Sequence, residues 1–85
     1  MATVIITADA RGQFNDLPLA IKGRLQAVIE RLADWPEVSG AKPLRKELKG
    51  AFRIRTGDYR VLFTVDQRAD RVTVFRIDNR RDVYQ

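Results

Sequence analysis

Three strand-like segments in the C-terminal half of the chain constrain the fold more than any other feature. Residues 51–56 alternate in polarity, and residues 59–66 and 71–78 are rich in β-branched and aromatic side chains. Gly57 and Asp58 separate the first two segments and have the length and chemistry of a two-residue hairpin loop. A short polar segment supplies the second turn. The pattern predicts an antiparallel β-meander in this half of the chain.

The N-terminal half has the pattern of a short strand followed by two amphipathic helices. Residues 3–7 alternate in the manner of a strand. Asp9 is expected to cap the first helix, and Pro18 to end it and to open the second. Pro36 stops the second helix. One apolar stripe runs along that helix and must be buried: Ile21, Leu25, Val28, Ile29, Leu32 and Trp35.

Together these segments predict an α+β fold in a single domain, residues 1–85. The expected order is β-α-α-β-β-β: an N-terminal strand, then an αα-hairpin packed on one face of an antiparallel β-sheet. The length of 85 residues suits one domain and leaves no room for a second. Because the helices cover only one side, the other face of the sheet is expected to be open.

The residue types that are missing restrict the chemistry. The chain has no cysteine and no histidine, which removes disulfides, thiolate metal sites and the commonest general base. We therefore expect no metal and no cofactor, and any catalysis must use Arg, Lys, Tyr, Asp or Glu. No apolar run approaches the roughly 20 residues that span a bilayer, and the N-terminus lacks a signal-peptide pattern. A soluble, cytoplasmic protein without a membrane partner is expected.

Positive charge is concentrated in the C-terminal half. Residues 1–41 carry four basic and five acidic side chains, whereas residues 42–85 carry twelve basic and six acidic ones. The densest basic cluster, with Lys46 and Lys49, lies in a connector that is expected to form a short helical turn. This asymmetry indicates an anionic partner, or else a generally basic, soluble surface.

A two-residue loop at Gly57-Asp58 fixes which side chains share a face of the hairpin. It places Arg55 opposite Arg60 and Arg53 opposite Leu62, and side chains alternate between the faces along each strand. The core face then holds Phe52, Ile54, Tyr59, Val61 and Phe63. The other face holds Arg53, Arg55 and Arg60, with Leu62 and Thr64 beside them.

The opposition of Arg55 and Arg60 carries chemical information. Directly opposed residues lie about 5 Å apart, and like charges at that distance destabilise a sheet. An anion or an acidic side chain between the arginines would relieve the repulsion. The planar guanidinium suits phosphate geometry, so an RNA backbone is one such anion. The alternative is an ordinary solvated face on which the arginine stems cover apolar surface.

The register of the third strand stays open. An even-length second turn adds Val72 and Val74 to the core face, whereas an odd one adds Thr73, Phe75 and Ile77. The central position expected for this strand allows apolar residues on both faces, so composition does not choose between the registers.

The C-terminal segment extends the basic character past the predicted sheet. Arg80 and Arg81 add two cations, and Tyr84 follows them. Two interpretations of Tyr84 are open. Its ring stacks on a nucleobase or donates a hydrogen bond there, or it packs as a terminal aromatic side chain on the domain.

A family resemblance rests on residues 48–63, LKGAFRIRTGDYRVLF, and residues 77–84, IDNRRDVY. Both stretches resemble the RelE/ParE superfamily, the toxins of type II toxin–antitoxin systems, and the length and element order fit along the whole chain. The resemblance implies one of two activities. RelE-like members are metal-independent endoribonucleases that cut mRNA, typically in the ribosomal A site, whereas ParE-like members poison DNA gyrase. A cognate antitoxin wraps and neutralises both kinds.

The resemblance to the RelE branch also implies residue roles. Arg53 and Arg55 match two basic residues of the first hairpin strand, and Arg60 matches the arginine after the Gly-x-Tyr element. Arg80 matches a tail arginine, and Tyr84 matches the tail tyrosine. These five positions correspond to the phosphate clamp and the catalytic group of that branch.

Two positions affect the acid–base chemistry. Many relatives carry a histidine where this chain has Asn79, and some use a connector glutamate as base, near Glu47 here. The catalytic set expected from the resemblance is Arg60, Arg80, Tyr84 and Arg55. The expected phosphate-binding set is Arg53, Arg55, Lys46, Lys49 and Arg81. The alternatives are a gyrase poison with no nuclease activity, or an inactive member that only binds its antitoxin.

Overall fold

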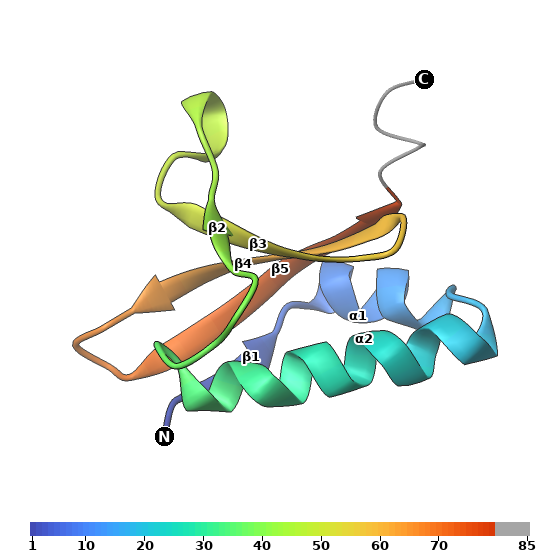
Figure 1. Ribbon diagram of the computed structural model, residues 1–85, viewed down its shortest axis with the longest axis horizontal. Helices are drawn as coiled ribbons and strands as arrows, with labels where there is room; N and C mark the ends of the chain where they lie inside the picture. Colours follow the sequence, from blue (N-terminus) through green and yellow to red (C-terminus); the bar gives the residue numbers. More distant parts are fainter. Residues whose placement is uncertain (80–85) are drawn as a thin grey trace.

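The structure, a computed structural model, describes residues 1–79. Within these residues five strands form one sheet, and helices cover one of its faces (Figure 1). The helices are α1 (Ala8–Asn15) and α2 (Leu19–Arg31), and 3₁₀ turns lie at Leu32–Asp34 (η1) and Lys46–Leu48 (η2). The strands are β1 (Thr3–Ile6), β2 (Lys42–Pro43), β3 (Ala51–Thr56), β4 (Tyr59–Asp66) and β5 (Arg71–Asn79).

The strands lie in the order β1-β5-β4-β3-β2. Strands β2 to β5 pair antiparallel, and β1 pairs parallel to β5 at one edge. The predicted α+β fold, with a helical hairpin on one face of the sheet, is confirmed, and so is the helical turn in the connector. The sequence pattern did not predict the parallel pairing of β1. It also missed strand β2, because a strand of two residues has no alternation to detect.

Helix α1 begins two residues earlier than the sequence indicates. Thr7 is the N-cap, and its hydroxyl oxygen accepts a hydrogen bond from the Ala10 backbone N–H at 3.2 Å. The expectation that Asp9 caps the helix is therefore wrong. Its carboxylate lies instead in the first turn, where a negative charge interacts favourably with the helix dipole.

The predicted apolar stripe forms the helical half of the core, although α2 ends at Arg31 and the stripe continues in η1, not in an α-helix that reaches Pro36. Leu25 and Leu32 are fully buried, and Val28 and Ile29 are nearly so. The sheet contributes Ile54, Val61, Phe63, Val72, Val74 and Ile77. The Trp35 ring closes the core at one end, because its centroid lies 4.9 Å from that of Phe52 and 5.5 Å from that of Phe63.

The register of the first hairpin is the predicted one. Arg55 faces Arg60, and Arg53 faces Leu62. Gly57 has a φ of 60°, the left-handed conformation that a two-residue hairpin loop can require at its first position. A side chain with a Cβ would be strained there, so this glycine fixes the loop length and with it the faces of both strands.

A bulge divides the pairing between β4 and β5. On one side of it Phe63 faces Val74, and on the other side Leu62 faces Arg76, a shift of one residue. Both predicted registers of the third strand are therefore realised locally. Val72 and Val74 are buried before the bulge, and Ile77 is buried beyond it.

Candidate functional site

The sheet face that points away from the helices gathers basic side chains in two rows. The first row runs across four strands through Lys42, Arg53, Leu62 and Arg76. The second row runs across three strands through Arg55, Arg60 and Asp78. Opposed residues point to the same side of a sheet, so these seven side chains share one surface, which we call the arginine face.

Arg60 occupies the centre of the second row and is held by Asp78. Its Nε–H donates to Asp78 Oδ1 at 2.9 Å, and its Nη2–H donates to Oδ2 at 2.8 Å. Each of the two side chains is 16% exposed. This bidentate pair fixes the plane of the guanidinium. Asp78 approaches Arg60 from β5, so its charge offsets that of Arg60 but does not lie between Arg55 and Arg60.

The remaining cations of the arginine face are more accessible. Arg55, Arg76 and Lys42 are exposed, and Arg53 is half-buried. Leu62 is fully buried although it lies on this face and outside the main core cluster. The expectation of a fully open face is therefore wrong at this point, and the arginine face is a partly covered surface with an apolar centre.

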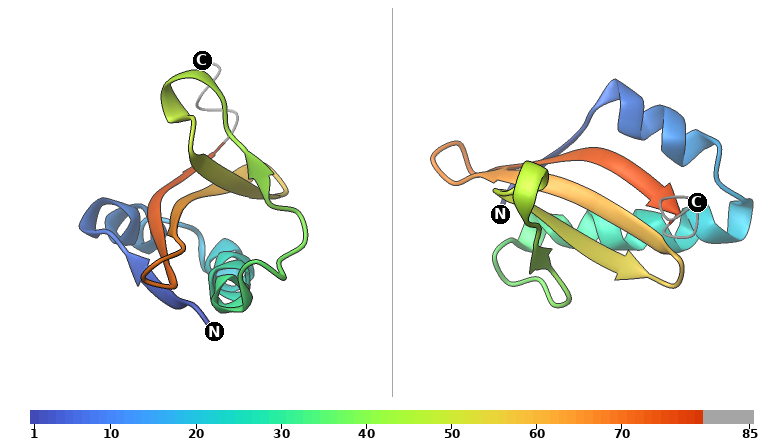
Figure 2. Two further views of the ribbon diagram at one scale, coloured as in Figure 1. Left: turned by 90° about the vertical axis from the view of Figure 1, so that its left-hand side faces the viewer. Right: turned by 90° about the horizontal axis from the view of Figure 1, so that it is seen from above.

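The connector between β2 and β3 rises on the same side of the sheet, opposite the helices (Figure 2). It carries Lys46 and Lys49, both exposed, and Glu47, also exposed, lies between them in η2. The φ of Lys46 is 59°, a left-handed conformation that non-glycine residues rarely adopt. The connector, with its basic cluster, therefore lies on the side of the sheet to which the predicted phosphate-binding arginines belong (Figure 2).

The structure places some of the predicted site residues and not others. Asn79 ends β5, half-buried and opposite Tyr59. Arg80, Arg81 and Tyr84 lie outside the described residues.

Three residues of the arginine face were not predicted from the sequence. Lys42 joins it through the short strand β2, and Arg76 and Asp78 join it through the bulge. Without the bulge, Arg60 would face Ile77 and Asp78 would point to the other side of β5. No sequence signal marks the bulge, so alternation alone could not have found the Arg60–Asp78 pair.

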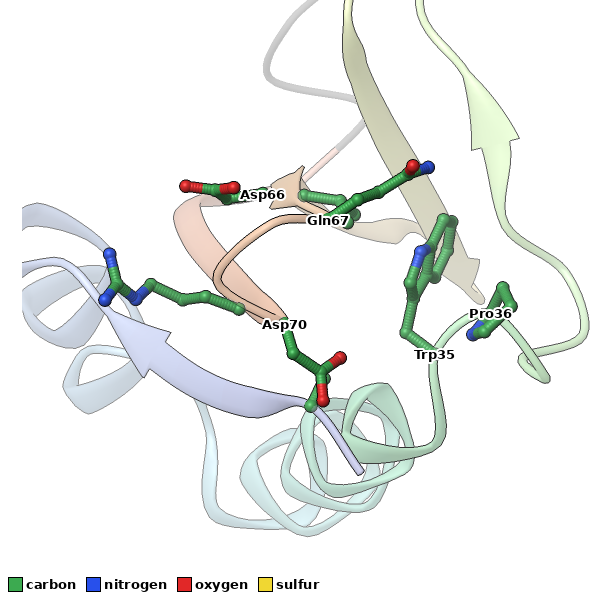
Figure 3. A pocket seen from close by; sticks show the side chains of 8 residues that line it. Trp35, Pro36, Asp66, Gln67 and Asp70 are labelled. Atoms are coloured by element: carbon green, nitrogen blue, oxygen red, sulfur yellow. The ribbon is translucent and has the colours of Figure 1, made fainter.

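A pocket of about 330 Å³ lies at the opposite end of β4 from Arg60 (Figure 3). Trp35 and Pro36 form one wall, and the turn that connects β4 to β5, with Gln67 and Asp70, forms another. Its titratable lining includes Asp66 and Asp70 beside the single cation Arg71. This pocket is separate from the arginine face and has no excess of positive charge for an anion.

Within residues 1–79, no group of three or more acidic, histidine or cysteine side chains is arranged to hold a metal ion. None of the helices there has the length and apolar character needed to cross a membrane.

Comparison with known proteins defines the class. The fold matches solved toxin structures: one protein of the RelBE2 toxin–antitoxin complex from Mycobacterium tuberculosis has a TM-score of 0.82 and 35% identity, with 93% of this chain and 98% of that chain covered. The isolated Escherichia coli RelE toxin has a TM-score of 0.77 at 14% identity, with 93% of this chain and 84% of that chain covered, and shares the fold.

The sequence comparisons assign the family. The family model described as "ParE toxin of type II toxin-antitoxin system, parDE" matches residues 4–84. Toxin RelG of Mycobacterium tuberculosis is 40% identical over 87 residues, covering 98% of this chain and 95% of the relative. Toxin RelE of the same organism is 36% identical over 83 residues, covering 96% and 84%. The chain belongs to the RelE/ParE superfamily and is a toxin of a type II toxin–antitoxin system.

Proposed function

We propose that this toxin is a metal-independent endoribonuclease that cleaves mRNA on the ribosome and so inhibits translation. The arrangement of Arg55, Arg60 and Asp78 supports the proposal most directly. An oriented guanidinium and an exposed one, directly opposed on one face, suit a phosphate whose charge increases during reaction. The similarity to toxins named RelG and RelE favours the RelE branch.

The reaction uses the nucleophile that RNA itself carries. The 2′-oxygen loses its proton and attacks the adjacent phosphorus, and the bond from phosphorus to the 5′-oxygen breaks. The 5′-oxygen then takes up a proton, and a 2′,3′-cyclic phosphate remains. Between these steps the phosphorane carries extra negative charge, and fixed positive donors stabilise it more strongly than they stabilise the substrate.

Arg55 and Arg60 are assigned to this charge stabilisation, together with Arg80 from the C-terminal segment. Arg53, Lys46, Lys49 and Arg81 are assigned to the flanking phosphates, and Arg76 joins them because the bulge brings it to the arginine face. Tyr84 is the candidate for proton transfer. With Asn79 in place of a histidine, positioning by the ribosome is expected to carry much of the catalysis.

Arg55 is the best residue for a test, because it is exposed and takes part in none of the ion pairs found within residues 1–79. Arg55→Ala is expected to lower mRNA cleavage about 100-fold, since removing one donor to a developing anion typically costs that much. Arg55→Lys keeps the charge but not the planar fork, so it should recover only part of the activity. Primer extension on mRNA bound to programmed ribosomes measures the cleavage.

Arg68→Ala is the matched control. Arg68 is an equally exposed arginine, and it lies in the turn between β4 and β5, away from Arg55. Its substitution should leave cleavage unchanged. Full cleavage by a folded Arg55→Ala protein would contradict the assignment of this residue.

A gyrase poison without nuclease activity is the second candidate, and the description of the matching family model as a ParE toxin favours it. It predicts double-strand breaks in a gyrase cleavage assay and no cut sites in mRNA. The ribonuclease proposal predicts the reverse, so the two assays on the same purified toxin distinguish them. An inactive, antitoxin-binding member would give a negative result in both.

The proposed partners are a cognate antitoxin, mRNA and the ribosomal A site, with no membrane and no small-molecule cofactor. A structure of the RelBE2 complex, in which a protein 35% identical to this chain takes part, supports the antitoxin. An acidic or amphipathic antitoxin segment that covers the arginine face would block the phosphate site. Such binding should weaken as salt is added, because salt screens surface charge.

A further inference from the structure

Asp78 has an unusual place in a surface proposed to bind a polyanion. It is an acidic side chain at the β5 end of the second row of the arginine face, beside Arg60, where a negative charge opposes RNA binding. Its carboxylate uses both oxygens on Arg60, at 2.9 and 2.8 Å, and only 16% of its side chain is exposed. A carboxylate on an ordinary solvated face would be more exposed and would not accept hydrogen bonds from one guanidinium with both of its oxygens.

The backbone is built to bring Asp78 to this position. The bulge between β4 and β5 changes the register by one residue, and this change turns Asp78 to the side of Arg60. The neighbouring residue Ile77 is fixed from the other side, because its backbone N–H donates to Gln13 Oε1 of α1 at 2.7 Å. Two independent features, a bulge and a helix side chain, therefore hold the strand segment that carries Asp78.

We infer that Asp78 is a positioning residue: its carboxylate holds the Arg60 guanidinium from the side away from Arg55 and orients it for the scissile phosphate. This inference rests on the proposed ribonuclease function and names a residue that the function did not assign. Asp78 does not touch the RNA in this arrangement. It lowers the net charge of the site and in return holds Arg60 in one plane.

These two effects of Asp78 make opposite contributions to binding and to chemistry. Removing its charge makes the arginine face more positive, so the mRNA–ribosome complex should bind more tightly. Removing the carboxylate takes away the two hydrogen bonds that orient the Arg60 guanidinium, so the cleavage step should slow. A residue that only stabilised the fold would change the amount of active protein and would change neither quantity per folded molecule.

The experiment is single-turnover cleavage of mRNA on programmed ribosomes by the full-length toxin. Asp78→Asn is expected to lower the maximal rate about 10- to 100-fold, as misplacement of a catalytic group does. Its half-saturating concentration should fall by about 2- to 3-fold, as expected for a small gain in attraction. Asp78→Glu restores the charge and the two oxygens, and it should recover part of the rate.

Asp66→Asn is the matched control for charge. Asp66 is an exposed carboxylate and the last residue of β4. Its side chain lies on the same side of that strand as Arg60 but at the opposite end, next to the turn that leads to β5. The Asp66→Asn substitution removes one negative charge, as Asp78→Asn does, but leaves Arg60 and Asp78 paired. We expect its maximal rate to equal that of the wild type.

An exchange of the two residues separates stability from position. Arg60→Asp combined with Asp78→Arg keeps an ion pair between β4 and β5 but moves the guanidinium to the other strand. This protein should melt close to the wild-type temperature and still lose cleavage about as fully as Asp78→Asn. Wild-type cleavage by the exchanged protein, or by folded Asp78→Asn, would overturn the inference and leave the ribonuclease function standing. A wild-type toxin that cuts no mRNA would overturn both.

Discussion

Arg60 differs from the other cations of the arginine face in its environment. Its side chain is 16% exposed and bidentately paired, whereas Arg55 and Arg76 are exposed. A substitution at Arg60 therefore changes stability as well as chemistry, because it leaves the Asp78 carboxylate partly buried without this partner. At the scale of single residues, Arg55 reports on charge stabilisation more cleanly than Arg60 does.

Arg60→Ala is expected to destabilise the protein by about 1–3 kcal/mol, the usual cost of leaving a hydrogen-bonding group away from water without its partner. Arg60→Ala combined with Asp78→Ala should cost less than the two single substitutions added together, because the double variant leaves no unpaired charge. Urea denaturation followed by circular dichroism measures all three. Strict additivity would show that the pair contributes no coupling to the folded state.

The bulge in β4–β5 is the element that organises the site. It allows one strand to serve the core with Val72 and Val74 and, a few residues later, to present Arg76 and Asp78 on the opposite face. Strand β1 pairs with β5 as far as Ile6. Further along β5, the Gln13 side chain accepts a hydrogen bond from the backbone N–H of Ile77. Helix α1 thus stabilises the part of β5 that carries Asp78.

Gln13→Ala is expected to destabilise the protein by about 1 kcal/mol, since the Ile77 N–H loses its acceptor. The effect should be local, with faster hydrogen exchange at the Ile77 amide than at amides in the core of the sheet. Gln26→Ala is the control, because that side chain is exposed and its hydrogen bond to Glu30 is long, at 3.4 Å. Equal exchange at Ile77 in both variants would contradict the role of Gln13.

Helix α2 owes its place to its buried stripe. Leu25→Ala should cost about 2–5 kcal/mol, because Leu25 is fully buried and its truncation leaves a cavity. Leu19→Ala, on the same helix but 86% exposed, should cost less than about 0.5 kcal/mol. Thermal unfolding of both variants gives the comparison. Similar melting temperatures for the two variants would contradict the burial of Leu25 in the core.

At the scale of the whole molecule, the fold separates packing from charge. The helices cover one face of the sheet, and the connector lies on the other side (Figures 1 and 2). The strand pairing places the side chains of the arginine face on that other side as well. The excess of basic residues seen in the C-terminal half of the sequence thus becomes a predominantly positive surface on one side of the protein. A polyanion such as RNA is attracted by such a surface without reading its sequence.

Binding of single-stranded RNA should therefore depend strongly on salt. Each phosphate neutralised on a single strand contributes about −0.7 to the slope of log affinity against log salt concentration. Arg76→Ala is expected to reduce the slope by about that amount, whereas Arg68→Ala in the distant turn should leave it unchanged. Fluorescence anisotropy of a labelled RNA between about 50 and 200 mM salt measures the slope. An unchanged slope for Arg76→Ala would remove this residue from the RNA surface.

The sequence determined the fold class, the α2 core and the register of the first hairpin. Each of these depends on local rules: helical periodicity, alternation along a strand, and the loop geometry that Gly57 permits. The same rules placed Arg53, Arg55 and Arg60 on one side and identified their repulsion. The tertiary structure decided how that repulsion is relieved. It supplied Asp78 through a bulge and Gln13 through a contact 64 residues away in the chain, and neither leaves a local signal because both depend on pairing between distant segments.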